Sequence, residues 1–208
     1  MTQKRGGRPD PAAHKEQPEA ILSEQLFAAH TKKQLHPKAS RAVAAGLICV
    51  MGEILDGAYL LRLNADADEA GGKEIQPRQV DDAIRSDNAL RRLLAAWLLE
   101  RAPAARTEPQ PVQQPVASAP DGALEGAIDR MMSEISPDES VTVSASAKSV
   151  LVGLLALLIE RLMHAADVLS TRISSNVIYA EDVRAAVQVM LTGELRQLAD
   201  REISRATA

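Results

Sequence analysis

The stretch Val150-Leu-Val-Gly-Leu-Leu-Ala-Leu-Leu-Ile159 decides the fold, because it is apolar on every face that a helix would present. Such a helix has to be covered by other elements on several sides. The run is about half as long as a membrane-spanning helix and is followed at once by two charged residues. It therefore predicts a buried core helix, with Ser144 or Ser146 as its cap and an end near Arg172.

Shorter helical patterns flank this core helix on both sides. Before it, a helix with an apolar face ends at Pro137. After it, the pattern predicts a helix over 180–191, which follows a short loop. Thr192 is placed to cap a final helix. The first half of the chain follows the same plan. After a short helix, Pro37 marks a break and Ser40 can cap a long helix that reaches about Asn64.

The next helix of the first half opens at Pro77, where a missing N–H costs nothing, and Asp87 can cap the last one. The two halves can be aligned at an offset of 103 residues, which supports an internal duplication. Four apolar pairs match at this offset: Ile75 with Ile178, Val80 with Val183, Ala83 with Ala186, and Ile84 with Val187.

Composition divides the 208 residues into four parts. Polar, Pro- and Gly-containing sequence predicts a disordered tail over 1–18, and a Pro- and Gln-rich stretch predicts a linker over 102–122. Between and after them lie two helical domains, 19–101 and 123–208. Aromatic residues make up only 2%, which suits packed helices better than sheets. A lone Cys49 and the lack of an apolar signal region before Ala20 indicate a protein that is not secreted.

A long helix between two short ones, present twice, resembles the histone fold, whose units pair in a handshake. The stretch Ile75-Gln-Pro-Arg-Gln-Val-Asp-Asp-Ala-Ile-Arg-Ser-Asp-Asn-Ala-Leu-Arg-Arg-Leu-Leu94 resembles the loop, third helix and C-terminal helix of the two-A core histone. Val43-Ala-Ala-Gly-Leu47 and Glu53-Ile-Leu-Asp-Gly-Ala58 resemble its central helix. Ile159-Glu-Arg-Leu162, the run 178–189 and Leu191-Thr-Gly-Glu-Leu195 resemble the two-B core histone.

A fused two-A and two-B pair is similar to the histone doublets of giant viruses. The resemblance implies an all-α fold of two histone folds, each with short, long and short helices plus a C-terminal helix, paired in an intramolecular handshake. It also implies binding of double-stranded DNA through phosphate contacts, with a second core-histone pair as partner in a nucleosome-like particle. The implied location is the nucleus or a chromatin-like compartment, including a viral factory or virion. The implied DNA-binding residues are Lys32, Lys33, Lys38, Arg41, Lys73, Arg78, Lys148 and Arg172.

The resemblance further implies an acidic patch, whereas the plainer interpretation is a set of ordinary solvated carboxylates. Its residues would be Glu53, Asp56, Asp87, Glu194 and Glu202. The net charge of −4 is unusual for a DNA-packaging protein. Residues 1–41, however, carry eight basic and four acidic side chains, whereas the second half is acidic. We therefore expect DNA contact to be asymmetric and unusually salt-sensitive.

Catalytic and cofactor sites are not indicated. Gly71-Gly-Lys-Glu74 lacks the Ser or Thr of a phosphate-binding loop, and the histidines have no partners at metal-ligand spacing. We expect no enzyme activity, cofactor, metal, small-molecule substrate or membrane partner. Three function classes stay open: a DNA-packaging histone doublet, a histone-fold subunit of a transcription-type complex with weak DNA contact, and a helical dimerisation protein without a DNA role.

Overall fold

A computed structural model of the protein describes residues 21–64, 74–101, 121–137 and 141–208. Most of the described residues are helical, and the strands are two residues long each. The predicted tail and most of the predicted linker lie outside the described residues. The elements are α2 (Glu24–Ala28), β1 (Gln34–Leu35), α3 (Pro37–Asn64), β2 (Glu74–Ile75), α4 (Pro77–Ser86), α5 (Asn88–Leu93), α6 (Ala95–Arg101), α7 (Asp121–Ile135), β3 (Thr142–Val143), α8 (Ala145–Arg172), β4 (Val177–Ile178), α9 (Ala180–Met190) and α10 (Gly193–Thr207).

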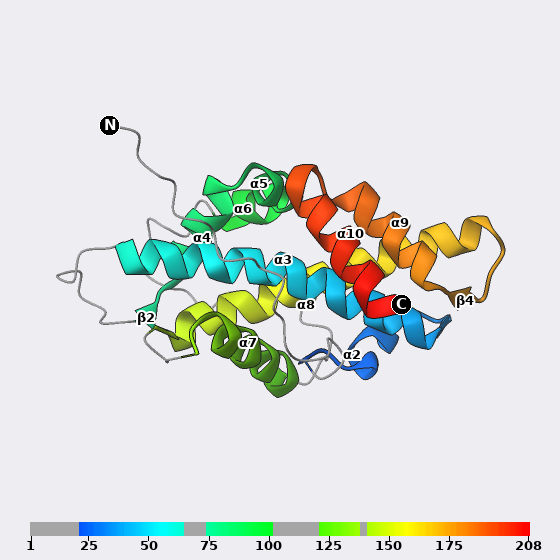
Figure 1. Ribbon diagram of the computed structural model, residues 1–208, viewed down its shortest axis with the longest axis horizontal. Helices are drawn as coiled ribbons and strands as arrows, with labels where there is room; N and C mark the ends of the chain where they lie inside the picture. The colour runs from blue at the N-terminus through cyan, green and yellow to red at the C-terminus, as the bar shows by residue number, and fades with distance from the viewer. Residues whose placement is uncertain (1–20, 65–73, 102–120, 138–140) are drawn as a thin grey trace.

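The two long helices, α3 and α8, form the centre of the molecule (Figure 1). By length and composition both could cross a membrane, with mean hydropathies of 1.6 and 1.7 over their most apolar windows. In the fold, 67% and 44% of these windows are buried. The run 150–159, predicted to be a covered core helix, lies in α8 and contributes Leu151, Leu154 and Leu155 to the core.

Each half of the chain covers the other. Helix α3 of the first half packs against α9 and α10 of the second half, and α10 crosses it obliquely in Figure 1. An ion pair holds α10 to α9: Arg184 Nη2 lies 2.7 Å from Asp200 Oδ2. Hydrogen bonding from Arg184 lowers the pKa of Asp200 below its ordinary value. The pairing of the two halves that the resemblance implies is therefore observed.

Two pairs of short parallel strands join the halves at opposite ends of the molecule (Figure 1). At one end β1 pairs with β4, and at the other end β2 pairs with β3. The same backbone hydrogen bond extends both pairs: His36 N donates to Ile178 O, and Ser144 N donates to Ile75 O, at 3.0 Å each. In each pair, a strand before a long helix meets a strand after the other long helix.

The internal duplication extends to local hydrogen bonding. All four predicted apolar pairs are buried, none with more than 3% of its surface exposed. The helices that follow β2 and β4 also begin in the same way. Gln76 N donates to Gln79 Oε1 at 2.8 Å, and Tyr179 N donates to Asp182 Oδ2 at 2.9 Å. These two bonds are again related by an offset of 103 residues.

Some predicted helix boundaries are wrong in the first half. Helix α3 begins at Pro37, not at Ser40, because a proline ring is compatible with the first turn of a helix. The hydroxyl of Ser40 is buried inside that turn and caps nothing among the described residues. The predicted last helix is divided at Leu94 into α5 and α6. In the second half, Ser144 is the cap of α8, and its Oγ accepts from Ala147 N at 3.2 Å.

The arrangement of the described elements is that of two histone folds paired in an intramolecular handshake. Each half has a short helix, a 28-residue helix, a short helix and a C-terminal helix or helix pair. The two parallel strand pairs, β1 with β4 and β2 with β3, join the two halves at the ends of the paired fold. The predicted fold class is confirmed.

Candidate nucleic-acid interface

Exposed basic side chains gather where β1 meets β4, which we call the β1–β4 end. Lys32 precedes β1, Lys38 and Arg41 lie in the first turns of α3, and Arg172 lies in the last turn of α8. All four residues are exposed. The strand pairing brings Arg172 to the same end as the three residues of the first half, although it is far from them in sequence. Four of the predicted DNA-binding residues therefore share one end of the molecule.

Lys33 belongs to the same end but occupies a different position. Its ammonium group lies 2.6 Å from Ser170 Oγ, 2.7 Å from Thr171 Oγ1 and 3.1 Å from Asp167 O. The Lys33 side chain is only 15% exposed. A cation is favourable at this point because the last carbonyls of a helix carry partial negative charge. Lys33 thus ties the first half to the C-terminal turn of α8. Beside it, the exposed Lys38 ammonium lies 3.5 Å from the backbone oxygen of Ala208.

An aromatic contact also crosses the β1–β4 end. The rings of His36 and Tyr179 lie 5.5 Å apart at an interplanar angle of 35°. His36 Nδ1 accepts a hydrogen bond from Lys38 N at 3.2 Å. Both ring-bearing residues are exposed at the surface, so they add rigid, partly polar contact area next to the basic side chains.

The opposite end, where β2 meets β3, is more nearly neutral. Arg78 Nε lies 3.6 Å from Asp82 Oδ2, and Lys148 Nζ lies 2.6 Å from Asp129 Oδ1. Lys73, predicted for this end, lies outside the described residues, and the adjacent Glu74 is exposed. The two predicted basic residues that are described here therefore already have carboxylate partners. Any anion bound at this end would compete with those partners.

Three of the five predicted acidic-patch residues line one groove, which we call the α5–α10 groove. It lies between α3, α5 and α10 and brings Glu53, Asp87 and Glu194 together. Leucines and one arginine complete its lining. The full set of lining residues is Glu53, Asp87, Leu90, Glu194, Leu195, Gln197, Leu198 and Arg201.

The predicted patch carboxylates differ in their interaction partners and in whether they line the groove. Asp87 Oδ1 accepts from Ala89 N and Leu90 N, at 2.7 and 2.8 Å, as the N-cap of α5. Glu202 does not line the groove, and its carboxylate lies 3.2 Å from Arg205 Nη1. Asp56 is half-buried and also lies outside the groove lining. Sequence reasoning missed Arg201, whose charge partly offsets the three groove carboxylates.

Cys49 lies in the core next to this region. Burial raises the pKa of its thiol to about 12, and the carboxylates of Glu53 and Glu202 act in the same direction. The thiol is buried, and its raised pKa disfavours the nucleophilic thiolate near neutral pH.

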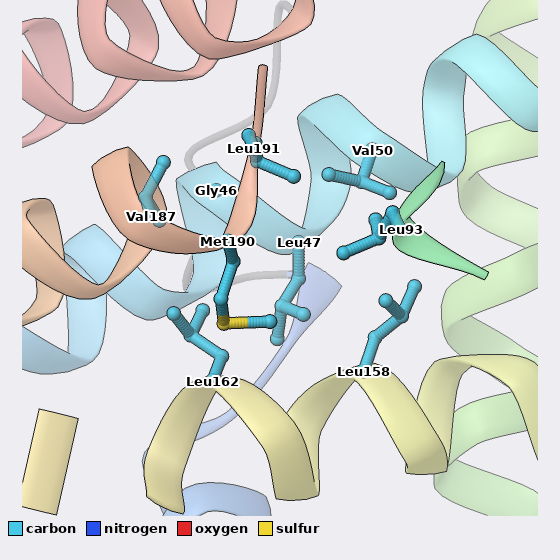
Figure 2. Close-up of a pocket in the computed structure, with 9 residues that line it drawn as sticks. All are labelled: Gly46, Leu47, Val50, Leu93, Leu158, Leu162, Val187, Met190 and Leu191. Carbon is cyan, nitrogen blue, oxygen red and sulfur yellow. The ribbon is translucent and has the colours of Figure 1, made fainter. Parts of the chain in front are cut away.

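A small apolar cavity lies where the two halves meet (Figure 2). Figure 2 shows side chains from α3, α8 and α9 converging on it, with Leu93 completing one side. Its lining offers no charged group: Gly46, Leu47, Val50, Leu93, Leu158, Leu162, Val187, Met190 and Leu191. Such a site has no polar group to orient a ligand, so we regard it as a packing defect of the interface. Among the described residues, no group of three or more His, Cys, Asp or Glu side chains could hold a metal ion.

Comparison with known proteins finds a relative among the histones. The chain is similar to histone H2B of Encephalitozoon cuniculi (strain GB-M1), with 28% identity over 83 residues. The match covers 40% of this chain and 64% of that histone, so it spans less than two thirds of the relative's length. No protein-family model matches the chain. The likeness to a histone agrees with the handshake described above.

Proposed function

We propose that the protein is a structural histone-fold doublet that binds double-stranded DNA and packages it with a second core-histone pair. The observation that carries this proposal is the β1–β4 end, where Lys32, Lys38, Arg41 and Arg172 are exposed beside a crossed strand pair. Basic side chains at such a surface bind the phosphate backbone without reading bases. In this role the protein is structural rather than catalytic, and it resides in the nucleus or another chromatin-like compartment.

Salt dependence of DNA binding tests this proposal. The slope of log affinity against log salt concentration falls by about 0.9 for each phosphate contact that is removed. We expect the variant Lys32→Ala, Lys38→Ala, Arg172→Ala to lose about 2 to 3 units of slope. The matched variant at the other end, Arg78→Ala with Lys148→Ala, should lose less, because both side chains are already ion-paired. Fluorescence anisotropy with duplex DNA measures both slopes.

Packaging has a second readout. Reconstitution with histones of the three and four types on long DNA, followed by nuclease digestion, should leave discrete protected fragments. If the purified protein fails to retain duplex DNA at low salt even with those histones present, DNA packaging is excluded.

A second candidate function is a histone-fold subunit that contacts DNA weakly or through a partner. The ion pairs at the β2–β3 end favour it, because they leave less free positive charge there. The acidic α5–α10 groove also favours it as a surface for a basic protein segment. A smear instead of discrete fragments in the nuclease digest, together with retained partner binding, would support this candidate over the first.

A further inference from the structure

Ile173 is an apolar residue that the fold presents at one tip of the molecule. It belongs to the loop between α8 and β4, which forms that tip in Figure 1, and it is 67% exposed. A single exposed apolar residue on a protein surface needs no explanation by itself. The conformation of this loop and the charges around it, however, indicate a role for the side chain.

The start of the loop is held in one conformation by its own hydrogen bonds. Ser174 N donates to Thr171 O at 2.9 Å, and Ser175 N donates to Ser170 O at 3.1 Å. These are the two bonds of a Schellman turn, in which the residue after the helix cap takes a left-handed conformation. That residue is Ser174, with φ of 55°, at a position where glycine is usual. The turn fixes the backbone of Ile173, which is the C-cap residue of α8.

The end of the loop is held as well. Ser175 Oγ donates to Val177 O at 2.6 Å and accepts from Val177 N at 3.0 Å. Asn176 O accepts from Gln34 N at 3.1 Å, which ties the loop to β1. Because the loop is fixed at both ends, little conformational entropy is left to lose when a binding partner covers Ile173.

Positive charge surrounds Ile173 in the fold. Residues 29–41, which contain β1, carry four basic side chains and no carboxylate. Residues 168–180, which contain the loop, carry Arg172 and no carboxylate. The bonds from Lys33 to Ser170 and Thr171 place the first of these segments directly beside the last turn of α8. Ile173 therefore lies next to the basic side chains of the β1–β4 end.

The carboxylates nearest to the loop along the chain do not cancel this charge. Asp167 lies 3.7 Å from Lys33 Nζ, and Asp182 accepts from Tyr179 N at the start of α9. Glu181, beside Asp182, is exposed but lies beyond β4. An apolar side chain among exposed cations fits a polyanion with an apolar interior. Duplex DNA is such a polyanion, because its stacked bases lie between two phosphate backbones.

We propose that Ile173 inserts into the minor groove of duplex DNA bound at the β1–β4 end and partly unstacks one base step. The proposal deepens the DNA-binding role proposed above and rests on it. Apolar wedges of this kind kink the duplex toward its major groove. Lys32 and Arg172 then hold phosphates of the neighbouring backbone, and this attraction offsets the cost of unstacking.

Such a wedge selects DNA by how easily it kinks. Pyrimidine–purine steps such as TA are the most easily unstacked, whereas A-tracts are stiff. We therefore expect tighter binding to a duplex with a central TA step than to an A-tract, and we expect Ile173 to be responsible for the difference. The salt dependence of binding, which reports phosphate contacts, should not depend on Ile173.

Fluorescence of 2-aminopurine at the single TA step of a short duplex tests the insertion, because its emission rises when the base is unstacked. The wild-type protein should raise the emission, whereas Ile173→Ala should bind the duplex without raising it. The affinity of Ile173→Ala should fall by about tenfold or less, because unstacking offsets part of the gain from burying an isoleucine. Its slope of log affinity against log salt concentration should equal the wild-type slope.

Two matched variants test whether the effect belongs to this side chain. Ile173→Leu keeps an apolar side chain of the same size and should raise the emission as the wild-type protein does. Leu99→Ala, at a 74% exposed leucine of α6, removes apolar surface elsewhere and should also behave like the wild-type protein. Because both positions are exposed, each variant should unfold at the wild-type temperature.

The outcomes distinguish failure of this proposal from failure of the proposed function. Salt-dependent DNA binding without a rise in emission overturns the insertion alone, and so does a rise that Ile173→Ala retains. If Ile173→Ala instead loses binding to histones of the three and four types, the side chain contacts protein and the proposal is wrong. A wild-type protein that binds no DNA overturns both proposals.

Discussion

At the scale of the single residue, Lys32 and Lys33 show how adjacent lysines take different roles. Both belong to a basic cluster in the sequence, and the resemblance to histones assigns both to DNA. In the structure Lys32 is exposed, whereas the Lys33 ammonium reaches three oxygens of the last turns of α8. Those oxygens come from a part of the chain more than 130 positions away, which no local pattern could indicate.

Replacing each lysine by methionine should separate the two roles. Lys33→Met keeps the aliphatic stem but removes a charged donor, so we expect a loss of about 1 to 2 kcal/mol in the free energy of unfolding. Lys32→Met should change that free energy by less than about 0.5 kcal/mol. It should instead lower the salt slope of DNA binding by about 0.9. Urea unfolding and anisotropy measure the two quantities, and a reversed pattern would contradict the assignment.

The acidic residues illustrate the same limit. The resemblance predicted five patch positions, and three of them meet in one groove. Glu202 is held by Arg205 on its own helix, and Arg201 enters the groove beside the carboxylates. Spacing along α10 places these residues on a helix, but the direction of each side chain depends on packing against α3 and α5. The assignment of the groove to a basic partner stays a prediction.

At the scale of the helix, caps and boundaries were predicted unequally well. The second half was predicted closely because the uninterrupted apolar run 150–159 begins shortly after Ser144, and α8 ends at Arg172 as expected. In the first half a proline was interpreted as a break, although the helix begins at that proline. The local sequence is compatible with a break at Pro37 and with a helix that begins there. The pairing of β1 with β4, which holds the chain just before Pro37, decides that the helix begins at that proline.

Two cap residues with different hydrogen bonding provide a test at this scale. Ser144 accepts a hydrogen bond from the first turn of α8, whereas Thr192 makes no such side-chain bond to α10. We expect Ser144→Ala to lower the free energy of unfolding by about 1 kcal/mol. Thr192→Ala should cost less than about 0.5 kcal/mol, since no cap bond is lost. Equal losses in thermal or urea unfolding would show that the Ser144 bond contributes nothing.

At the scale of the whole molecule, the duplication and the apolar run of α8 were enough to predict a paired fold. An isolated half would leave its long helix exposed, and the crossed strands show how the halves meet. The predicted tail over 1–18 and linker over 102–122 stay predictions, because most of their residues lie outside those described.

Cutting the chain tests the handshake directly. A protease site inserted near Pro111, which lies outside the described residues, should allow the chain to be cleaved without separating the halves. The reason is that α3 is covered by α9 and α10 of the other half, and both strand pairs cross between the halves. After cleavage, both fragments should co-elute in size-exclusion chromatography under native conditions. Independent elution of the fragments would contradict the intramolecular pairing.

The covering of α3 by α10 has a consequence for synthesis of the chain on the ribosome. Helix α3 ends at Asn64, yet the helix that packs against it runs from Gly193 to Thr207. At about 5 to 20 residues per second, roughly 7 to 30 seconds separate the two. Throughout that interval the apolar surface of α3 lacks its final cover, so the nascent chain is a natural client for chaperones. If the halves were two separate proteins, the time before each half met its partner would depend on diffusion. In this chain the time before α3 is covered depends only on the rate of elongation.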